Sequence, residues 1–183
     1  MRRNPSTVVV LTGEAGPQAL DAIGRSMNVT LVNADGDGLD SAADALRRAS
    51  GIASPYVLVR GDPLAAMAER WRAMWDIRQD THDTTEFELR AGEVLAAWRA
   101  GRFELPDYYL LISHNDAADG PPDFYLGPLR AARPNRVAVA IADEPREQAA
   151  QVLHALGSLR HGPWWPPLDE IIATARDFYP ATL

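Results

Sequence analysis

Five short apolar runs divide the chain, and each has the composition of a buried β-strand. They consist mainly of Val, Ile, Leu, Ala and Tyr and do not alternate with polar residues. Strands that are buried on both faces show this pattern, which is typical of parallel sheets. The sequence therefore predicts five mainly parallel strands, at residues 7–11, 29–32, 56–59, 108–112 and 137–141.

Helical patterns lie between these runs. Pro17 and the pair Asp62-Pro63 suit the first turns of helices, and the segment 85–88 resembles a capping box whose helix ends at Gly101. Further apolar stripes predict a helix capped by Asp40 or Ser41, a short helix at 128–132, a helix capped by Asp143, and a last helix at about 167–178.

Strands that alternate with helices predict an α/β fold with helices on both faces of the sheet. The longest connection, the two-helix excursion at 62–101, lies between the third and fourth strands. A strand order of 3-2-1-4-5 requires a long crossover at this place, so we expect this order rather than the flavodoxin-like 2-1-3-4-5. The expectation is a three-layer, Rossmann-like, doubly wound domain that spans residues 1–183.

Composition excludes several kinds of chemistry. The chain has no Cys, which rules out disulfides, thiol catalysis and Cys-ligated zinc. All 18 basic residues are Arg, which rules out a P-loop lysine and a Schiff-base lysine. The net charge of −7 argues against nucleic acid or an anionic membrane as the main partner. No apolar run is long enough for a membrane span or a signal-peptide core, so a bacterial cytoplasmic location is expected.

Each predicted strand is followed by polar residues at its carboxyl end, the edge where sheets of this class bind ligands. With the expected strand order, Glu14, His114, Asn115 and Asp116 face one another across the crevice between the first and fourth strands. Glu14, His114 and Asp116 are therefore the catalytic candidates. The alternative is that these groups serve only as turn and helix-cap residues.

The first loop, Thr12-Gly13-x-x-Gly16, resembles the opening of nucleotide-binding Rossmann domains. The resemblance implies a phosphate at the helix N-terminus and a ribose hydroxyl at Asp35. The departure is that Leu11 occupies the position of the first glycine in that motif. The expected ligand-binding residues are Thr12, Gly13, Gly16, Asp35, Ser113 and Asn115.

The second loop, residues 35–42 with the sequence Asp-Gly-Asp-Gly-Leu-Asp-Ser-Ala, resembles the first metal-binding motif of the DHH phosphoesterase family. The resemblance implies that Asp35 and Asp37 bind Mg²⁺ or Mn²⁺, which would polarise a phosphate and activate water. This chain has Asn33 where the family usually has His, and it lacks the Asp-His-His triplet. The loop also resembles the Asp-x-Asp loop of Toprim nucleases, with Glu14 as the first acid. A plain turn is the alternative, because Asp-Gly sequences form turns by themselves.

Two adjacent tryptophans, Trp164 and Trp165, lie among prolines before the last helix. They either clamp that helix onto the body or form an exposed patch for a partner or a second copy. Two functions therefore stay open. One is a domain that binds a nucleotide or another phosphorylated compound, with or without divalent-metal-dependent hydrolysis. The other is a non-catalytic interaction scaffold that uses Trp164 and Trp165.

Overall fold

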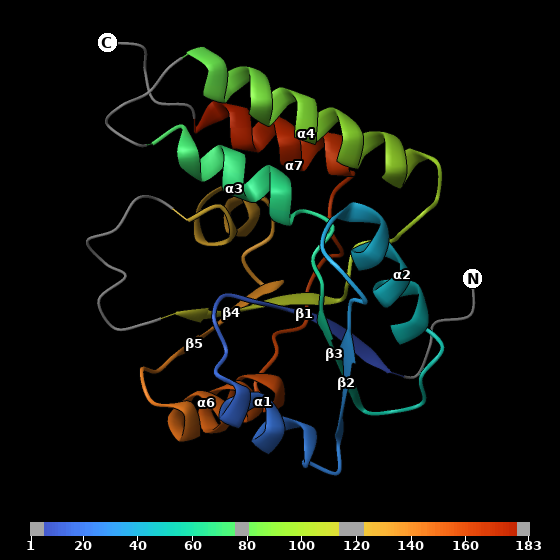
Figure 1. The fold of residues 1–183 in the computed structure, drawn as a ribbon, viewed down its shortest axis with the longest axis vertical. Helices are drawn as coiled ribbons and strands as arrows, with labels where there is room; N and C mark the ends of the chain where they lie inside the picture. Colours follow the sequence, from blue (N-terminus) through green and yellow to red (C-terminus); the bar gives the residue numbers. More distant parts are fainter. Residues whose placement is uncertain (1–5, 76–80, 114–122, 179–183) are drawn as a thin grey trace.

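The computed structural model describes residues 6–75, 81–113 and 123–178, and it contains a five-stranded, all-parallel sheet (Figure 1). The predicted strands are confirmed, and four of them extend one residue further at the carboxyl end. The strands are β1 (Thr7–Thr12), β2 (Val29–Asn33), β3 (Tyr56–Arg60), β4 (Tyr108–Ser113) and β5 (Val137–Ile141).

The observed strand order is β2-β3-β1-β4-β5, so the predicted order 3-2-1-4-5 is wrong in the placement of β2 and β3. β3 lies beside β1, with Thr7 opposite Tyr56, and β2 is an edge strand. The difference in burial between the two strands explains why β3, and not β2, lies beside β1. The central residues of β3 are fully buried, whereas Thr30 and Leu31 of β2 are only partly buried. The predicted long crossover is confirmed, because the connection from β3 to β4 passes β1.

Helices cover both faces of the sheet, as the pattern predicted. Figure 1 shows α1 and α6 on one face and α3, α4 and α7 on the other. The first face buries a core around Val9, Ile23 and Val152, and the second buries a core around Val10, Trp71 and Phe87. The helices are α1 (Pro17–Gly24), α2 (Leu39–Ala49), α3 (Ala65–Ala73), α4 (Thr81–Arg99), the π-helical turn η2 (Tyr125–Leu129), α5 (Arg130–Ala132), α6 (Pro145–Gly157) and α7 (Leu168–Asp177).

Some predicted helix starts are wrong. α4 begins at Thr81, so the expected capping box at 85–88 lies inside the helix. The residue before α2 is Gly38 rather than Asp40 or Ser41, and the residue before α6 is Glu144 rather than Asp143. The predicted end of α4 is confirmed. Gly101 has a φ of 70°, in the left-handed region that favours glycine, and its N–H donates to the Trp98 carbonyl.

The segment with the two tryptophans fastens α7 to the sheet. Trp165 is 6% exposed, and its indole Nε1 donates to the Pro106 carbonyl at 2.7 Å. The guanidinium of Arg136 lies over the Tyr108 and Trp164 rings and donates to the Pro163, Gly162 and Asp107 carbonyls. These contacts correspond to the clamp alternative, and Trp164 alone of the pair is substantially exposed, at 42%.

Within the described ranges, no helix has both the length and the apolar character that a membrane span needs.

Candidate functional site

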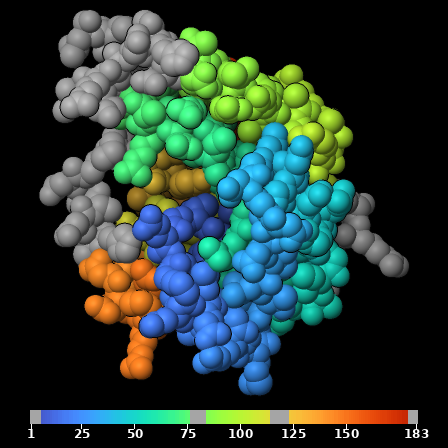
Figure 2. Space-filling model, in the orientation of Figure 1, coloured from blue at the N-terminus to red at the C-terminus, as the bar shows by residue number. Residues whose placement is uncertain are grey.

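A pocket of about 580 Å³ lies at the carboxyl ends of β1, β2 and β3, where ligand sites of parallel sheets are expected. We call it the carboxyl-edge pocket. Figure 2 shows a hollow on this side of the molecule, with the end of β3 between the ends of β1 and β2. Its wall contains Thr12, Gly13, residues 33–38, residues 60–62 and Tyr125.

Asp62, the second residue after β3, is the most constrained acid of this pocket. Its Oδ1 accepts hydrogen bonds from the Leu64 backbone N–H at 2.9 Å and from the Tyr109 hydroxyl at 3.1 Å. Its Oδ2 accepts a hydrogen bond from the Tyr125 hydroxyl. A carboxylate has about four acceptor positions. Three are filled by described residues, which leaves one on Oδ2 for a ligand.

The surroundings change the acid–base behaviour of Asp62. The residue retains some exposure toward the pocket, but its carboxyl group is enclosed, and this burial raises the pKa of Asp62 from 3.8 to about 6. The hydrogen bonds from Tyr125, Leu64 and Tyr109 favour the ionised form and oppose the increase. Burial and the nearby carboxylate raise the pKa of both tyrosines well above 10, so their hydroxyls stay donors at neutral pH. Asp62 therefore exchanges a proton near physiological pH.

Thr12, the last residue of β1, supplies an unused polar group. The residue is 7% exposed, and its Oγ1 has no hydrogen-bond partner among the described residues. Its side chain lies on the same face of β1 as Val8 and Val10, because alternate strand residues share a face. A buried hydroxyl without a partner costs about 1–3 kcal/mol. The Oγ1 atom itself is enclosed, so a ligand reaches it only if neighbouring side chains move aside.

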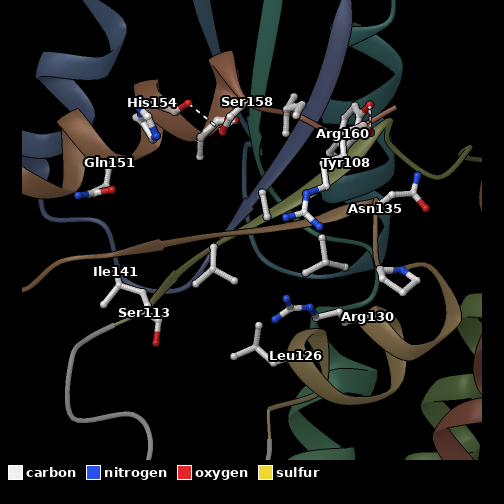
Figure 3. Close-up of a pocket in the computed structure, with 16 residues that line it drawn as sticks. Tyr108, Ser113, Leu126, Arg130, Asn135, Ile141, Gln151, His154, Ser158 and Arg160 are labelled. Carbon is white, nitrogen blue, oxygen red and sulfur yellow. Dashed lines mark hydrogen bonds between the residues drawn. The ribbon is translucent and has the colours of Figure 1, made fainter. Parts of the chain in front are cut away.

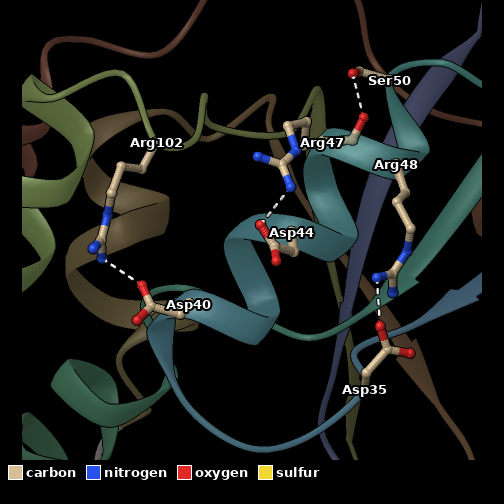
Figure 4. A network of polar contacts seen from close by, with 7 residues as sticks. All are labelled: Asp35, Asp40, Asp44, Arg47, Arg48, Ser50 and Arg102. Carbon is tan, nitrogen blue, oxygen red and sulfur yellow. Dashed lines mark hydrogen bonds and ion pairs between the residues drawn. The ribbon is translucent and has the colours of Figure 1, made fainter.

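Ion pairs and hydrogen bonds hold the loop after β2 in place (Figure 4). Asp35 Oδ2 accepts from Arg48 Nη1 at 2.5 Å, and the Asp35 side chain is 81% exposed. The Gly36 N–H donates to Ser41 Oγ at 2.9 Å, and Asp40 is paired with Arg102 at 2.7 Å. Asp35 and Asp37 both line the pocket, so the structure brings the two predicted metal ligands to one site. Metal binding there stays a prediction.

No cluster of three or more His, Asp or Glu side chains with metal-site spacing occurs in the part of the chain that the structure describes. A divalent ion at Asp35 and Asp37 would therefore have to complete its shell with backbone carbonyls, water or ligand oxygens. Mg²⁺ and Mn²⁺ accept such shells. The exposed ion pair between Asp35 and Arg48 would have to open for Asp35 to bind a metal ion.

The first loop packs against the body at both of its glycines. Gly13 has a φ of 85°, and a Cβ there would lie 2.2 Å from the Ile112 carbonyl oxygen, so only glycine fits beside β4. The Gly16 N–H donates to Gln148 Oε1 of α6 at 3.3 Å. Gly16 and the exposed Glu14 lie outside the pocket wall, while Thr12 and Gly13 lie in it. The glycines thus have a packing role that the Rossmann resemblance does not require.

The fourth strand contributes less than expected to this site. Ser113 lines a different pocket, beside β5, and its carbonyl accepts from the Ala142 N–H at 3.1 Å. His114, Asn115 and Asp116 lie outside the described residues, so the predicted group across β1 and β4 stays a prediction.

Sequence reasoning missed Asp62, Tyr109 and Tyr125 as site residues. The pair Asp62-Pro63 predicts a helix that is capped by Asp62, but this start is wrong, because α3 begins at Ala65 and the residue before it is Leu64. Asp62 Oδ1 instead accepts from the Leu64 N–H in the turn that precedes α3. The available signal was Tyr109, which carries a hydroxyl group inside a buried strand. A buried tyrosine hydroxyl usually requires a hydrogen-bond partner. Tyr125 gave no comparable signal, since it lies on an irregular turn.

The chain matches no protein-family model, and no curated protein matches it either.

Proposed function

We propose that this protein binds a small polar ligand in the carboxyl-edge pocket and that Asp62 and Thr12 make the central contacts. The observation that carries the proposal is the pairing of two incomplete groups in one pocket. Counting the described residues, the Asp62 carboxylate has one unused acceptor position, and the buried hydroxyl of Thr12 has no partner.

The charges of the wall define the ligand class. Asp35, Asp37 and Asp62 are acceptors, and Arg60 is the one cationic side chain among the described wall residues. A ligand that offers hydroxyl or amino donors suits this set, because each carboxylate can accept from it. We therefore propose a nucleoside-like or sugar-like compound with a donor on Asp62. In a phosphorylated form, its phosphate would lie at Arg60, where it meets a cation instead of a carboxylate.

The test is thermal unfolding of the protein with a panel of nucleosides, nucleotides and sugar phosphates, with and without Mg²⁺ or Mn²⁺. A bound compound at about 100 times its Kd stabilises the fold by roughly 2.7 kcal/mol, which is a shift of several degrees at this size. The Asp62→Asn variant is expected to lose most of that shift.

The matched control is Asp44→Asn. Asp44 is an exposed carboxylate paired with Arg47 at 2.8 Å on α2, and it lies outside the pocket wall (Figure 4). The control is expected to keep the full ligand response. A ligand response that survives in Asp62→Asn, or a panel that shifts no melting temperature, would contradict the proposal. A metal-dependent response that disappears in Asp37→Asn would support divalent-metal binding at Asp37, which a metal-dependent hydrolase would require.

A further inference from the structure

The outer edge of β5 is an open strand edge. Among the described strands β5 pairs only with β4, and the hydrogen bonds Tyr109 N–H to Arg136 O and Ala142 N–H to Ser113 O show which residues face β4. In a parallel pair, alternate residues bond to the same neighbour. Residues 136, 138, 140 and 142 therefore face β4, and the N–H and C=O groups of Val137, Val139 and Ile141 face outward. No described residue bonds to these outward groups.

A groove of about 590 Å³ follows this edge, between α6 on one side and the η2–α5 segment on the other. We call it the β5 groove. Val137, Val139 and Ile141 line the groove, and Ile141 is 51% exposed. Figure 3 shows β5 crossing the groove, with His154 and Gln151 of α6 on one side and Leu126 and Arg130 on the other.

The edge lacks the features that usually protect such strands. Proteins normally prevent pairing at an open edge with charged residues, proline or a bulge inside the strand. β5 has the sequence Val-Ala-Val-Ala-Ile, with none of these residues, and its register with β4 is regular. Backbone donors, backbone acceptors and apolar side chains are thus all presented together, which is the arrangement that accepts an added strand.

The positive charge of the β5 groove indicates which class of partner it can bind. Arg130 and Arg160 approach β5 from opposite sides (Figure 3), and neither guanidinium forms an ion pair with a described residue. The described wall of the groove contains no Asp or Glu, although the chain as a whole has a net charge of −7. A second copy that paired along this edge would bring these arginines against the same arginines of its partner. Like charges across strands are unfavourable, so an acidic partner fits better than a second copy.

We propose that an extended, acidic peptide segment of a partner protein adds to β5 as a sixth strand. Its backbone bonds to Val137, Val139 and Ile141, and its carboxylates pair with Arg130 and Arg160. Alternate apolar side chains of the peptide would pack on Val139 and Leu126, because strand residues alternate in direction.

The test uses the full chain and a fluorescent peptide of about eight residues with the repeat Glu-Glu-Val-Val, so that each face of the added strand carries both carboxylates and apolar side chains. Two control peptides have Lys in place of Glu, or N-methyl groups on alternate residues. We expect binding of the acidic peptide that weakens with added salt, and binding about tenfold weaker or more for each control. Equal binding of the acidic and Lys peptides, or no binding of the acidic peptide at about 1 mM, would overturn the proposal.

The protein variants locate the site. Val139→Pro removes an outward N–H and leaves the bonds to β4 intact, so it is tolerated at an edge position and is expected to weaken acidic-peptide binding about tenfold. Val139→Ala keeps the N–H and is the matched control, with an expected change of about threefold or less. Arg130→Gln with Arg160→Gln is expected to reduce the salt dependence. If Val139→Pro does not fold, the N-methyl peptide carries the same test from the partner's side.

The oligomeric state distinguishes an acidic peptide from a second copy of the chain as the partner of β5. Light scattering is expected to show no dimer that depends on β5. A dimer in the wild-type chain that becomes monomeric in Val139→Pro would overturn the acidic-peptide proposal and assign the edge to a second copy.

Discussion

Asp35 and Asp62 occupy equivalent places in the sequence, each two residues beyond the end of a buried strand, yet the structure gives them different chemistry. Asp35 follows the edge strand β2, where its side chain is 81% exposed and pairs with Arg48. Asp62 follows the inner strand β3, where Tyr109 and Tyr125 enclose its carboxyl group. Position within the sheet, rather than the local motif, therefore determines which of the two acids is enclosed and has a raised pKa.

The largest expected effect concerns the pH dependence of stability. The folded protein holds the Asp62 proton up to a pH of about 6, whereas an ordinary aspartate loses it near 3.8. Stability from this group is therefore fully present below 3.8 and is lost as the pH rises through 6, in total about 3 kcal/mol. Urea unfolding from pH 4 to pH 7 is expected to show this decrease in the wild type relative to Asp62→Asn. A difference between the two proteins that does not change with pH would contradict the enclosure of Asp62.

The second effect concerns the hydroxyl that bonds to Asp62 Oδ2. Tyr125→Phe removes that donor, so the ionised carboxylate loses a hydrogen bond and the pKa of Asp62 is expected to rise further. The expected loss of stability at pH 7 is about 1.5–3 kcal/mol, measured by urea unfolding.

Tyr108→Phe is the matched control for Tyr125→Phe. It also removes a tyrosine hydroxyl that donates a hydrogen bond, but the acceptor is the neutral Arg160 carbonyl at 3.0 Å. We expect a loss of about 1 kcal/mol and no change in the pKa of Asp62. If Tyr108→Phe and Tyr125→Phe moved that pKa equally, the bond to Oδ2 would have no special role.

Thr12→Val separates stability from binding. The substitution replaces a buried hydroxyl, for which the described residues offer no partner, by a methyl group of similar size. We expect the unliganded protein to become more stable by about 1 kcal/mol and ligand binding to weaken about fivefold or more. Thermal unfolding with and without ligand measures both changes. A destabilised variant would show that the Thr12 hydroxyl already has a role in the folded chain.

The smallest effect is expected at the other carboxylate. Asp35→Asn disrupts an exposed ion pair with Arg48 and should change stability by no more than about 0.5 kcal/mol. Urea unfolding at low and high salt is the measurement, since screening weakens exposed pairs. A loss as large as that of Tyr125→Phe would remove the contrast between the two acids.

The strands were predictable because runs such as Val8–Leu11 are short, rich in β-branched residues and followed by turn residues, which distinguishes a buried strand from a helix. The sequence did not predict that β3 lies between β1 and β2, because the choice depends on how far each strand is buried. The polar Thr30 in β2 was the available signal for an edge strand. The helix start at Thr81 was also missed, because local capping residues at 85–88 suggested a later one.

The location of the pocket at the strand ends was predictable, because the topology of parallel sheets fixes it. The sequence pattern predicts Thr12, Gly13, Asp35 and Asp37 as site residues, and all four line the pocket. Asp62 was not predicted as a site residue, since its chemistry depends on Tyr125, which is 63 residues away in the chain. Long-range contacts of this kind carry no periodic pattern, and the sequence alone gives no means to pair the residues.

A carbon-13 NMR titration of the Asp62 carboxyl carbon, assigned with the Asp62→Asn variant, measures the enclosure of Asp62 and its role in binding together. We expect a pKa of about 6 and a change in that pKa when a compound from the ligand panel binds. A pKa near 3.8 that no ligand alters would contradict both the enclosure of Asp62 and its proposed role in binding.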